Sequence, residues 1–277
     1  MIQIAAPLFI LRHDCREDLF SVLDRLHDLG FDGVEFLGFF GHEPAAIRDH
    51  LRSLSLTALG NHVPFDLFSS QTDSVIRDHL ILGCRYVTVS GPPKEWIGQP
   101  EKLEQYIREI TRIGRECRQQ GLRLLYHNHA DELYHHQDSM NLLDFILART
   151  PSDSMAFEPD LGWLGIAGEN PEKWLDQYQD RCPVIHLKDY YARDPHRIGD
   201  ISRLGDNRGG SENSFFEFRP TGYGVVNTPA LMRKIINCQP DWLVADHDLA
   251  YERDPYQDLR LSLNYMRDLL SVHVVRS

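Results

Sequence analysis

A chain of 277 residues with 42% hydrophobic side chains can bury one substantial core, and barrels of about 250 residues routinely form a single domain. The formal net charge of −12, without any run of Lys or Arg, argues against a nucleic-acid partner, because nucleic-acid binding draws its affinity from basic surface. These properties favour a small-molecule substrate.

One pattern repeats along the chain: a short apolar run, a polar turn, an amphipathic stretch and a glycine that restarts the cycle. Gly30, Gly83 and Gly121 each follow a helical stretch, where a left-handed cap residue is favoured. Eight such units predict an α/β fold, a (β/α)8 TIM barrel that occupies residues 1–277 as one domain. The strands are predicted at residues 2–9, 33–38, 56–62, 86–91, 122–128, 155–160, 184–189 and 242–248.

A long stretch between the seventh and eighth strands, at about 190–227, is rich in Gly, Asn and Arg and has no clear periodicity. Structureless loops of this length are uncommon and usually functional. Because it leaves the carboxyl end of the seventh strand, we expect it to lie over the active-site face as a lid or substrate loop.

Polar side chains close the last four predicted strands. In barrels of this architecture the active site lies at the carboxyl ends of the strands, so these side chains should converge and could hold a divalent metal. Glu35 and His62 end the second and third strands and add polar groups to the same rim. The residues that close the last four strands are His127 and His129, Glu158 and Asp160, His186 and Lys188, and Asp246, His247 and Asp248.

Several short motifs, in their order and spacing, resemble the sugar phosphate isomerase/epimerase family of xylose isomerase-like TIM barrels, near its inosose dehydratase-like members. The similarity extends from Gly33-Val34-Glu35 through Gly222-Tyr223-Gly224 to the final helix after Tyr256. The motifs are Tyr126-His127-Asn128-His129, Asp160-Leu161-Gly162-Trp163, Ala167-Gly168-Glu169-Asn170-Pro171 and His186-Leu187-Lys188-Asp189.

The resemblance implies one divalent metal, with His127, Asp160, His186 and Asp246 as ligands. Mixed imidazole and carboxylate ligands favour Mn or Zn, with Co, Fe or Mg as further candidates, over Ca. The superfamily more commonly has Glu on the fifth and eighth strands, and in ketose 3-epimerases those two residues also move the proton. His and Asp stand at those positions here, which argues against that proton transfer. The closer resemblance is to members with the Tyr-His-Asn-His strand, such as inosose dehydratases and lyases of oxidised sugars, and it shifts the expectation toward elimination beside a ketone.

The expected reaction, an isomerisation, epimerisation or dehydration of a keto-sugar, sugar phosphate or inosose, begins with loss of a proton next to a carbonyl. A metal on the carbonyl and hydroxyl oxygens would stabilise the resulting enediolate. The candidate bases are His129, Glu158 and Lys188, because residues two apart on a strand share a face with a proposed ligand. The candidate substrate-binding residues are Glu35, His62, Glu132, Trp163 and Arg219; Glu132 could instead orient a histidine.

Structural alternatives stay open for several of these residues. Asp160 and Asp189 could each cap a helix, and the strand register leaves His247 or Asp248 as alternatives to Asp246. Trp163 fits the core as well as a stacking wall for substrate. Gly222-Tyr223-Gly224 is read as turn chemistry without a cofactor, and Arg203, Arg208 and Arg219 could bind an anion or face solvent.

The sequence is compatible with one other function on this fold and argues against a second. A non-catalytic sugar-binding or partner subunit on the same fold is compatible with the departures at the fifth and eighth strands. An abasic-site endonuclease shares the barrel but needs a basic DNA-binding face. Five scattered cysteines, a start without signal-peptide features and the absence of any apolar stretch of about 18 residues predict a cytoplasmic protein with reduced thiols and no membrane partner. The sequence leaves the oligomeric state open, with a homo-oligomer as one candidate.

Overall fold

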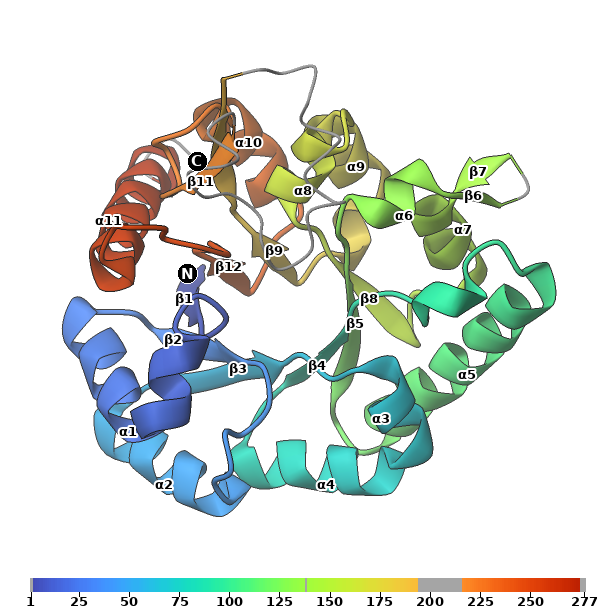
Figure 1. The fold of residues 1–277 in the computed structure, drawn as a ribbon, viewed down its shortest axis with the longest axis horizontal. Coiled ribbons are helices and arrows are strands. Elements are labelled where there is room, and N and C mark those ends of the chain that lie inside the picture. The colour runs from blue at the N-terminus through green and yellow to red at the C-terminus, as the bar shows by residue number, and fades with distance from the viewer. Residues whose placement is uncertain (1, 138, 194–215, 275–277) are drawn as a thin grey trace.

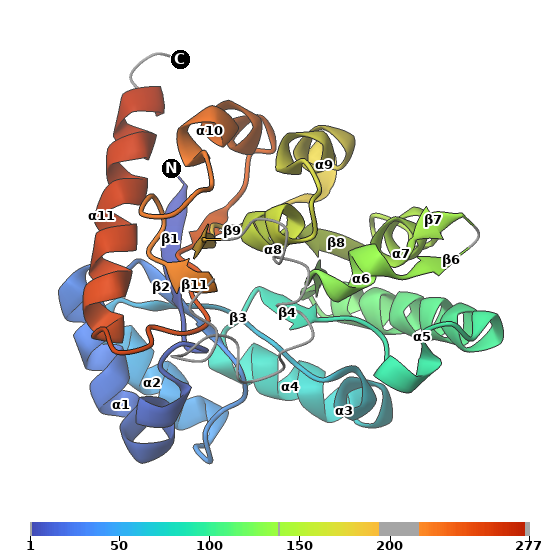
Figure 2. The ribbon, with the colours of Figure 1, turned by 45° about the horizontal axis from the view of Figure 1, so that its top comes forward.

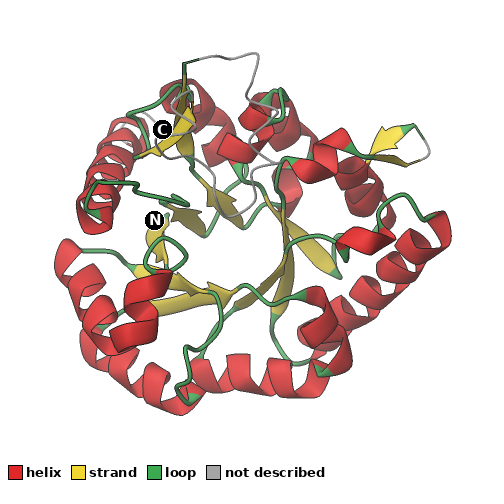
Figure 3. Ribbon diagram, in the orientation of Figure 1, coloured by secondary structure: helices red, strands yellow, loops and turns green. Residues whose placement is uncertain are grey.

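The computed structural model describes residues 2–137, 139–193 and 216–274, and within them eight parallel strands surround the centre of the molecule while helices cover the outside (Figures 1 and 3). The predicted barrel is confirmed. The strands are β1 (Gln3–Pro7), β2 (Gly33–Phe36), β3 (Thr57–Asn61), β4 (Tyr86–Val89), β5 (Arg123–His127), β8 (Met155–Glu158), β9 (Val184–His186) and β12 (Trp242–Val244).

The barrel consists of two sheets that meet at two seams. One sheet has the order β3-β2-β1-β12-β9 and the other the order β4-β5-β8. A single parallel bridge joins them at each seam, His62 with Thr88 on one side and Asp160 with His186 on the other. The strand ladders therefore end sooner than predicted, and the polar residues beyond them lie at the seams and the rim.

The helices pack their apolar faces on the barrel. In α5 the buried side chains recur every three or four residues, as the amphipathic pattern predicts. Gly30 and Gly83 end their helices with φ of 98° and 89°, which confirms them as left-handed caps. The helices are α1 (Arg12–Leu29), α2 (Pro44–Leu54), α3 (Phe65–Ser70), α4 (Thr72–Leu82), α5 (Pro100–Gln119), α6 (Asp131–Tyr134), α7 (Leu142–Arg149), α8 (Leu161–Ile166), α9 (Pro171–Gln177), α10 (Thr228–Asn237) and α11 (Pro255–Val274), with single 3-10 turns at Lys94–Trp96 and Gln179–Arg181.

The barrel interior is filled by side chains, not hollow. These residues alternate along the strands with those that face the helices, and they close the barrel beneath the polar rim. The interior residues are Ala5, Leu59, Tyr86, Leu125, Ala156, Val184, Trp242 and Val244.

The segment at 190–227 is predicted to be structureless, and this prediction is wrong for residues 190–192 and 216–219, which form strands. β10 (Asp189–Ala192) and β11 (Phe216–Arg219) pair as an antiparallel ribbon, because their buried aromatic side chains pack against α8. Residues 194–215, with Arg203 and Arg208, lie outside the described residues. A second small hairpin forms from β6 (His136–Gln137) and β7 (Met140–Asn141).

Asp189 anchors the chain that returns from this ribbon, and it does not cap a helix, since a strand follows it. Its carboxylate accepts hydrogen bonds from the backbone N–H groups of Tyr190, Gly222, Gly224 and Val226 at 2.8–3.0 Å. A Cβ at Gly224 would lie 2.2 Å from Asp189 Oδ1, so only glycine permits this approach. The Gly222-Tyr223-Gly224 motif is thus explained by a carboxylate within the chain.

Two further findings concern the whole described chain. All five cysteines are buried and none forms a disulfide, as predicted. Among the helices that the structure describes, none has the length and apolar character needed to cross a membrane.

The ribbon is tied to the last helix, and β11 lies beside α11 in Figure 2. Just beyond β11, the Thr221 N–H donates a hydrogen bond to Ser262 Oγ of α11 at 2.9 Å.

Candidate functional site

A cavity of about 700 Å³ opens at the carboxyl ends of the strands. One wall is apolar and comes from residues that follow β1, β2 and β3, including Phe9, Phe39 and Phe65. The other wall carries imidazole, ammonium and carboxylate groups. These polar lining residues include Glu35, Asn61, His62, His127, His129, His186, Lys188, Asp246 and Asp248.

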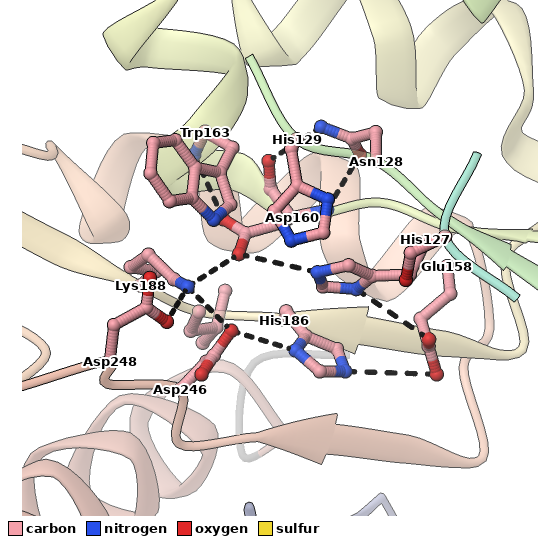
Figure 4. A network of polar contacts seen from close by, with 12 residues as sticks. His127, Asn128, His129, Glu158, Asp160, Trp163, His186, Lys188, Asp246 and Asp248 are labelled. Atoms are coloured by element: carbon pink, nitrogen blue, oxygen red, sulfur yellow. Dashed lines mark hydrogen bonds and ion pairs between the residues drawn. The ribbon is translucent and has the colours of Figure 1, made fainter. Parts of the chain in front are cut away.

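Two buried histidines, His127 at the end of β5 and His186 at the end of β9, form the centre of the polar wall (Figure 4). Their ring centroids are 4.5 Å apart. Each ring has one nitrogen on the side of Glu158 and the other on the side of Asp160 or Asp246. The two histidines therefore separate two groups of charged residues.

The first group, which we call the lysine cluster, consists of Lys188, Asp160, Asp246 and Asp248. Lys188 Nζ lies 3.1 Å from Asp160 Oδ2, 3.0 Å from Asp246 Oδ2 and 2.5 Å from Asp248 Oδ1. Burial lowers the pKa of Lys188, but the three carboxylates outweigh burial and raise its pKa above the ordinary value. The cluster thus holds a buried ammonium cation.

The two carboxylate oxygens of Asp160 have different partners. Its Oδ1 accepts a hydrogen bond from the Trp163 N–H at 2.9 Å and caps α8, the role that the sequence left open. Its Oδ2 faces Lys188 and His127. The helix cap fixes this carboxylate at the rim.

The register after β12 is settled by three contacts. Asp246 Oδ2 lies 2.9 Å from His186 Nδ1, and Asp248 pairs with Lys188. His247 points to the other side, where its Nε2 lies 3.3 Å from Asp258 Oδ2 of α11. Asp246 and Asp248 therefore belong to the site and His247 does not.

The second group, which we call the glutamate cluster, consists of Glu35, His62 and Glu158. His62 Nε2 lies 3.2 Å from Glu35 Oε2 and 3.6 Å from Glu158 Oε2, and Glu158 is fully buried. Burial, and then the Glu35 carboxylate, raise the pKa of Glu158 to about 7. Within the described residues, both Glu158 oxygens are without a hydrogen bond.

Unsatisfied polar atoms gather around the glutamate cluster. Buried polar atoms normally have hydrogen-bond partners, so a group of atoms without one indicates a missing ligand. Among the residues that the structure describes, six such atoms lie here: Glu35 Oε1, His62 Nε2, His127 Nδ1, Glu158 Oε1, Glu158 Oε2 and His186 Nε2.

The donor set fits a divalent metal. Ligand atoms of His127, Asp160, His186 and Asp246, the four residues implied by the resemblance, all lie within 4.8 Å of one another. Ligand atoms of His62, His127, Glu158 and His186 form a second group within the same limit. Imidazole nitrogens with carboxylate oxygens suit Zn and neighbouring transition metals.

Sequence reasoning assigned His62 to the substrate and Glu158 to proton transfer, and it did not identify them as ligands. The available signal was their position at strand ends. Burial, followed by the neighbouring His186 and His62, also holds the pKa of His127 well below its ordinary range, which leaves the neutral imidazole that a metal binds.

His129 lines the cavity and is held from behind by Glu132. The His129 N–H donates a hydrogen bond to Glu132 Oε2 at 3.0 Å, and the Tyr126 hydroxyl donates one to Glu132 Oε1 at 3.2 Å. Glu132 is 5% exposed and is not among the described lining residues. Its position corresponds to the orienting alternative and not to direct substrate contact.

Trp163 and Arg219, two of the proposed substrate-binding residues, contact other parts of the chain. Trp163 is buried, with its ring 5.7 Å from that of His129 and 5.1 Å from Lys188 Nζ. Arg219 forms an ion pair with Glu217 at 2.7 Å. Neither is among the described residues that line the cavity, so the structure places neither in direct reach of a substrate there.

The eight-stranded barrel and the candidate metal ligands at its rim are features of a known family of TIM-barrel proteins. The chain belongs to the xylose isomerase-like TIM barrel family, whose model matches residues 23–269. Over 194 residues it is 23% identical to an inosose dehydratase of Geobacillus kaustophilus, an alignment that covers 61% of this chain and 61% of that relative. The chain thus spans about three fifths of the relative's length.

Solved structures share the fold over nearly the whole chain. A sugar phosphate isomerase/epimerase from Parabacteroides distasonis superposes with a TM-score of 0.72 and 15% identity, covering 96% of both chains. The IOLI protein, solved with a zinc atom, superposes with a TM-score of 0.74 and 12% identity, covering 98% of both chains.

Proposed function

We propose that this protein is a metal-dependent enzyme that dehydrates a keto-sugar or inosose by removing a proton next to the ketone. The observation that carries the proposal is the pair of clusters at one cavity: a buried imidazole and carboxylate set that fits a metal, beside a buried ammonium group. The names of the relatives, an inosose dehydratase and a sugar phosphate isomerase/epimerase, support a carbohydrate substrate.

A divalent ion bound at this rim would polarise the substrate ketone and acidify the neighbouring C–H bond. His127 and His186, which belong to both ligand groups, would hold it. The remaining chemistry falls to residues of this chain that line the cavity.

His129 is the proposed base. It lines the cavity beside His127, with ring centroids 5.1 Å apart, and Glu132 fixes its backbone. A neutral imidazole carries a lone pair on one ring nitrogen and can therefore accept a proton. In the proposed first step His129 takes the proton next to the ketone, and the electron pair of the C–H bond moves into the ketone to give an enolate, which returns to substrate when it takes up a proton again.

Lys188 is the proposed acid rather than a base, because the surrounding carboxylates keep it protonated. In the second step the enolate re-forms the ketone, its electron pair forms a carbon–carbon double bond to the adjacent carbon, and the C–O bond there breaks. The departing hydroxide takes a proton from Lys188 and leaves as water. Hydroxide is basic enough for this transfer even from a stabilised ammonium, since the pKa of water is about 15.7. Proton exchange with solvent then restores Lys188 and His129.

The test uses the metal-loaded protein with inososes and 3-keto sugars in deuterated water. We expect loss of one water per turnover, with deuterium in the recovered substrate at the carbon next to the ketone. His129→Gln should abolish both signals. Lys188→Met should keep deuterium exchange while elimination falls by at least about 100-fold, the usual contribution of a general acid.

Other outcomes would assign a different function. Deuterium exchange with a rearranged product and no loss of water would replace dehydration by isomerisation or epimerisation. Metal binding without exchange on any of these ketones would contradict the proposed enzyme and favour a sugar-binding protein.

A further inference from the structure

We infer that the metal of the proposed function sits in the glutamate cluster, held by His62, His127, Glu158 and His186, and not among the four residues implied by the family resemblance. This inference rests on the proposed function. It assigns Asp160 and Asp246 to the positioning of His186 and Lys188 instead of to metal binding.

The first argument is the spacing of the ligand atoms. Metal–ligand distances of about 2.0–2.2 Å place neighbouring ligands of a tetrahedral ion about 3.3–3.6 Å apart. Glu158 oxygens lie 3.6 Å from His62 Nε2, 3.6 Å from His127 Nδ1 and 3.7 Å from His186 Nε2. The two distances from Oε2 lie at the upper end of this range, and the distance from Oε1 to His186 lies just above it.

The spacing on the other side of the histidines does not match. Asp246 Oδ2 lies 2.9 Å from His186 Nδ1, the length of a hydrogen bond, and Asp160 Oδ2 lies 3.9 Å from His127 Nε2. One separation is too short for two ligands of the same ion, and the other is longer than coordination requires.

The second argument is the orientation of His186. Ionised Asp246 only accepts hydrogen bonds, so the 2.9 Å contact assigns the ring proton to Nδ1 of His186. The lone pair is then on Nε2, which faces Glu35 and Glu158. Metal-binding histidines commonly donate their other ring N–H to a carboxylate in this way.

The third argument is charge. Lys188 Nζ already lies within 3.1 Å of the oxygens that Asp160 and Asp246 would offer to an ion. A divalent ion bound to the same oxygens would lie next to a buried ammonium group and would be repelled by it. The lysine cluster therefore already contains its cation.

The fourth argument is hydrogen bonding. The six unsatisfied buried atoms listed for the glutamate cluster face a common space, as Figure 4 shows for His127, Glu158 and His186. Glu35 Oε2 lies 3.2 Å from both His62 Nε2 and His186 Nε2, so Glu35 can supply a fifth ligand. The lysine cluster has one such atom, Asp160 Oδ2, and it already lies 3.1 Å from Lys188 Nζ, so within the described chain the larger unsatisfied set is the one at the glutamate cluster.

The experiment compares His62 and Asp160, each of which belongs to only one of the two ligand groups. Co²⁺ is titrated into the full-length protein, and binding is measured by visible absorption and by elemental analysis after dialysis. His62→Phe removes the donor and keeps the ring volume. Asp160→Asn keeps the shape and the helix cap. We expect His62→Phe to weaken Co²⁺ binding by at least about 100-fold and Asp160→Asn by less than about 10-fold.

Glu158→Gln serves as a second variant should His62→Phe fail to fold, and we expect the same loss of Co²⁺ from it. Retained binding in His62→Phe or Glu158→Gln, or an equal loss in Asp160→Asn, would overturn the inference. Absence of Co²⁺ and Zn²⁺ binding by the unmodified protein would instead overturn the proposed function, so the two failures are distinguishable.

Discussion

Replacing Asp189 by Asn should destabilise the protein although the two side chains have the same shape. Asp189 is 1% exposed, and each carboxylate oxygen accepts two backbone N–H groups: Oδ1 those of Tyr190 and Val226, Oδ2 those of Gly222 and Gly224. An amide keeps one acceptor oxygen and turns an NH2 group toward the other two N–H donors. Two donors would lose their partner, at about 1–3 kcal/mol each.

We therefore expect the free energy of unfolding to fall by about 2–6 kcal/mol in Asp189→Asn, measured by urea denaturation followed by circular dichroism. The matched control is Asp28→Asn, since the Asp28 side chain is 80% exposed and should change stability by less than about 0.5 kcal/mol. A stability of Asp189→Asn equal to that of Asp28→Asn would refute the assignment of Asp189 as the anchor of the returning chain.

Three further predictions concern other parts of the fold. Burial raises the pKa of Glu132 to about 8, so this residue is protonated in the folded state at neutral pH, and its stabilising contribution should be lost as pH rises from about 4.5 through 8. Glu132→Gln should remove this part of the pH dependence in urea unfolding at pH 5, 7 and 9, whereas exposed Glu252→Gln should retain it; parallel curves for all three proteins would contradict the pKa shift. Gly114→Ala would place a Cβ 2.1 Å from the Ser154 carbonyl oxygen, so α5 would have to move, and we expect a loss of at least about 3 kcal/mol, against less than about 1 kcal/mol for the exposed neighbour in Arg115→Ala. The five buried thiols should resist a disulfide-exchange reagent in the folded protein and all react in denaturant; rapid reaction of any of them without denaturant would show that its surroundings open easily.

The barrel could be predicted because its evidence is local. Each strand and helix can be predicted from the apolar pattern of its own residues, and a glycine such as Gly30 marks the end of a helix within a few residues. The β10–β11 ribbon was missed for the opposite reason. Its pairing joins segments separated by more than twenty residues, and the backbone donors that hold Asp189 have no signature in composition.

The site was predictable as a set of residues but not as a geometry. Strand ends identified His127, His186, Glu158 and Lys188 as neighbours, because parallel strands bring their carboxyl ends to one face. Which ring nitrogen of His186 faces which carboxylate depends on side-chain rotation, and strand spacing does not encode it. The same limit applies to Trp163, whose position behind His129 follows from the packing of α8.

The proposed metal site lies where the two sheets of the barrel meet. His62 and His186 belong to the five-stranded side of the barrel, while His127 and Glu158 belong to the three-stranded side, and only one bridge closes each seam between the described strands. An ion held by these four residues would cross-link the five-stranded sheet to the three-stranded sheet. At a free concentration one hundred times its dissociation constant, such an ion stabilises the folded chain by about 2.7 kcal/mol. Loss of the ion would then loosen the barrel at the place where the substrate enters, so the chemistry and the closure of the fold would fail together.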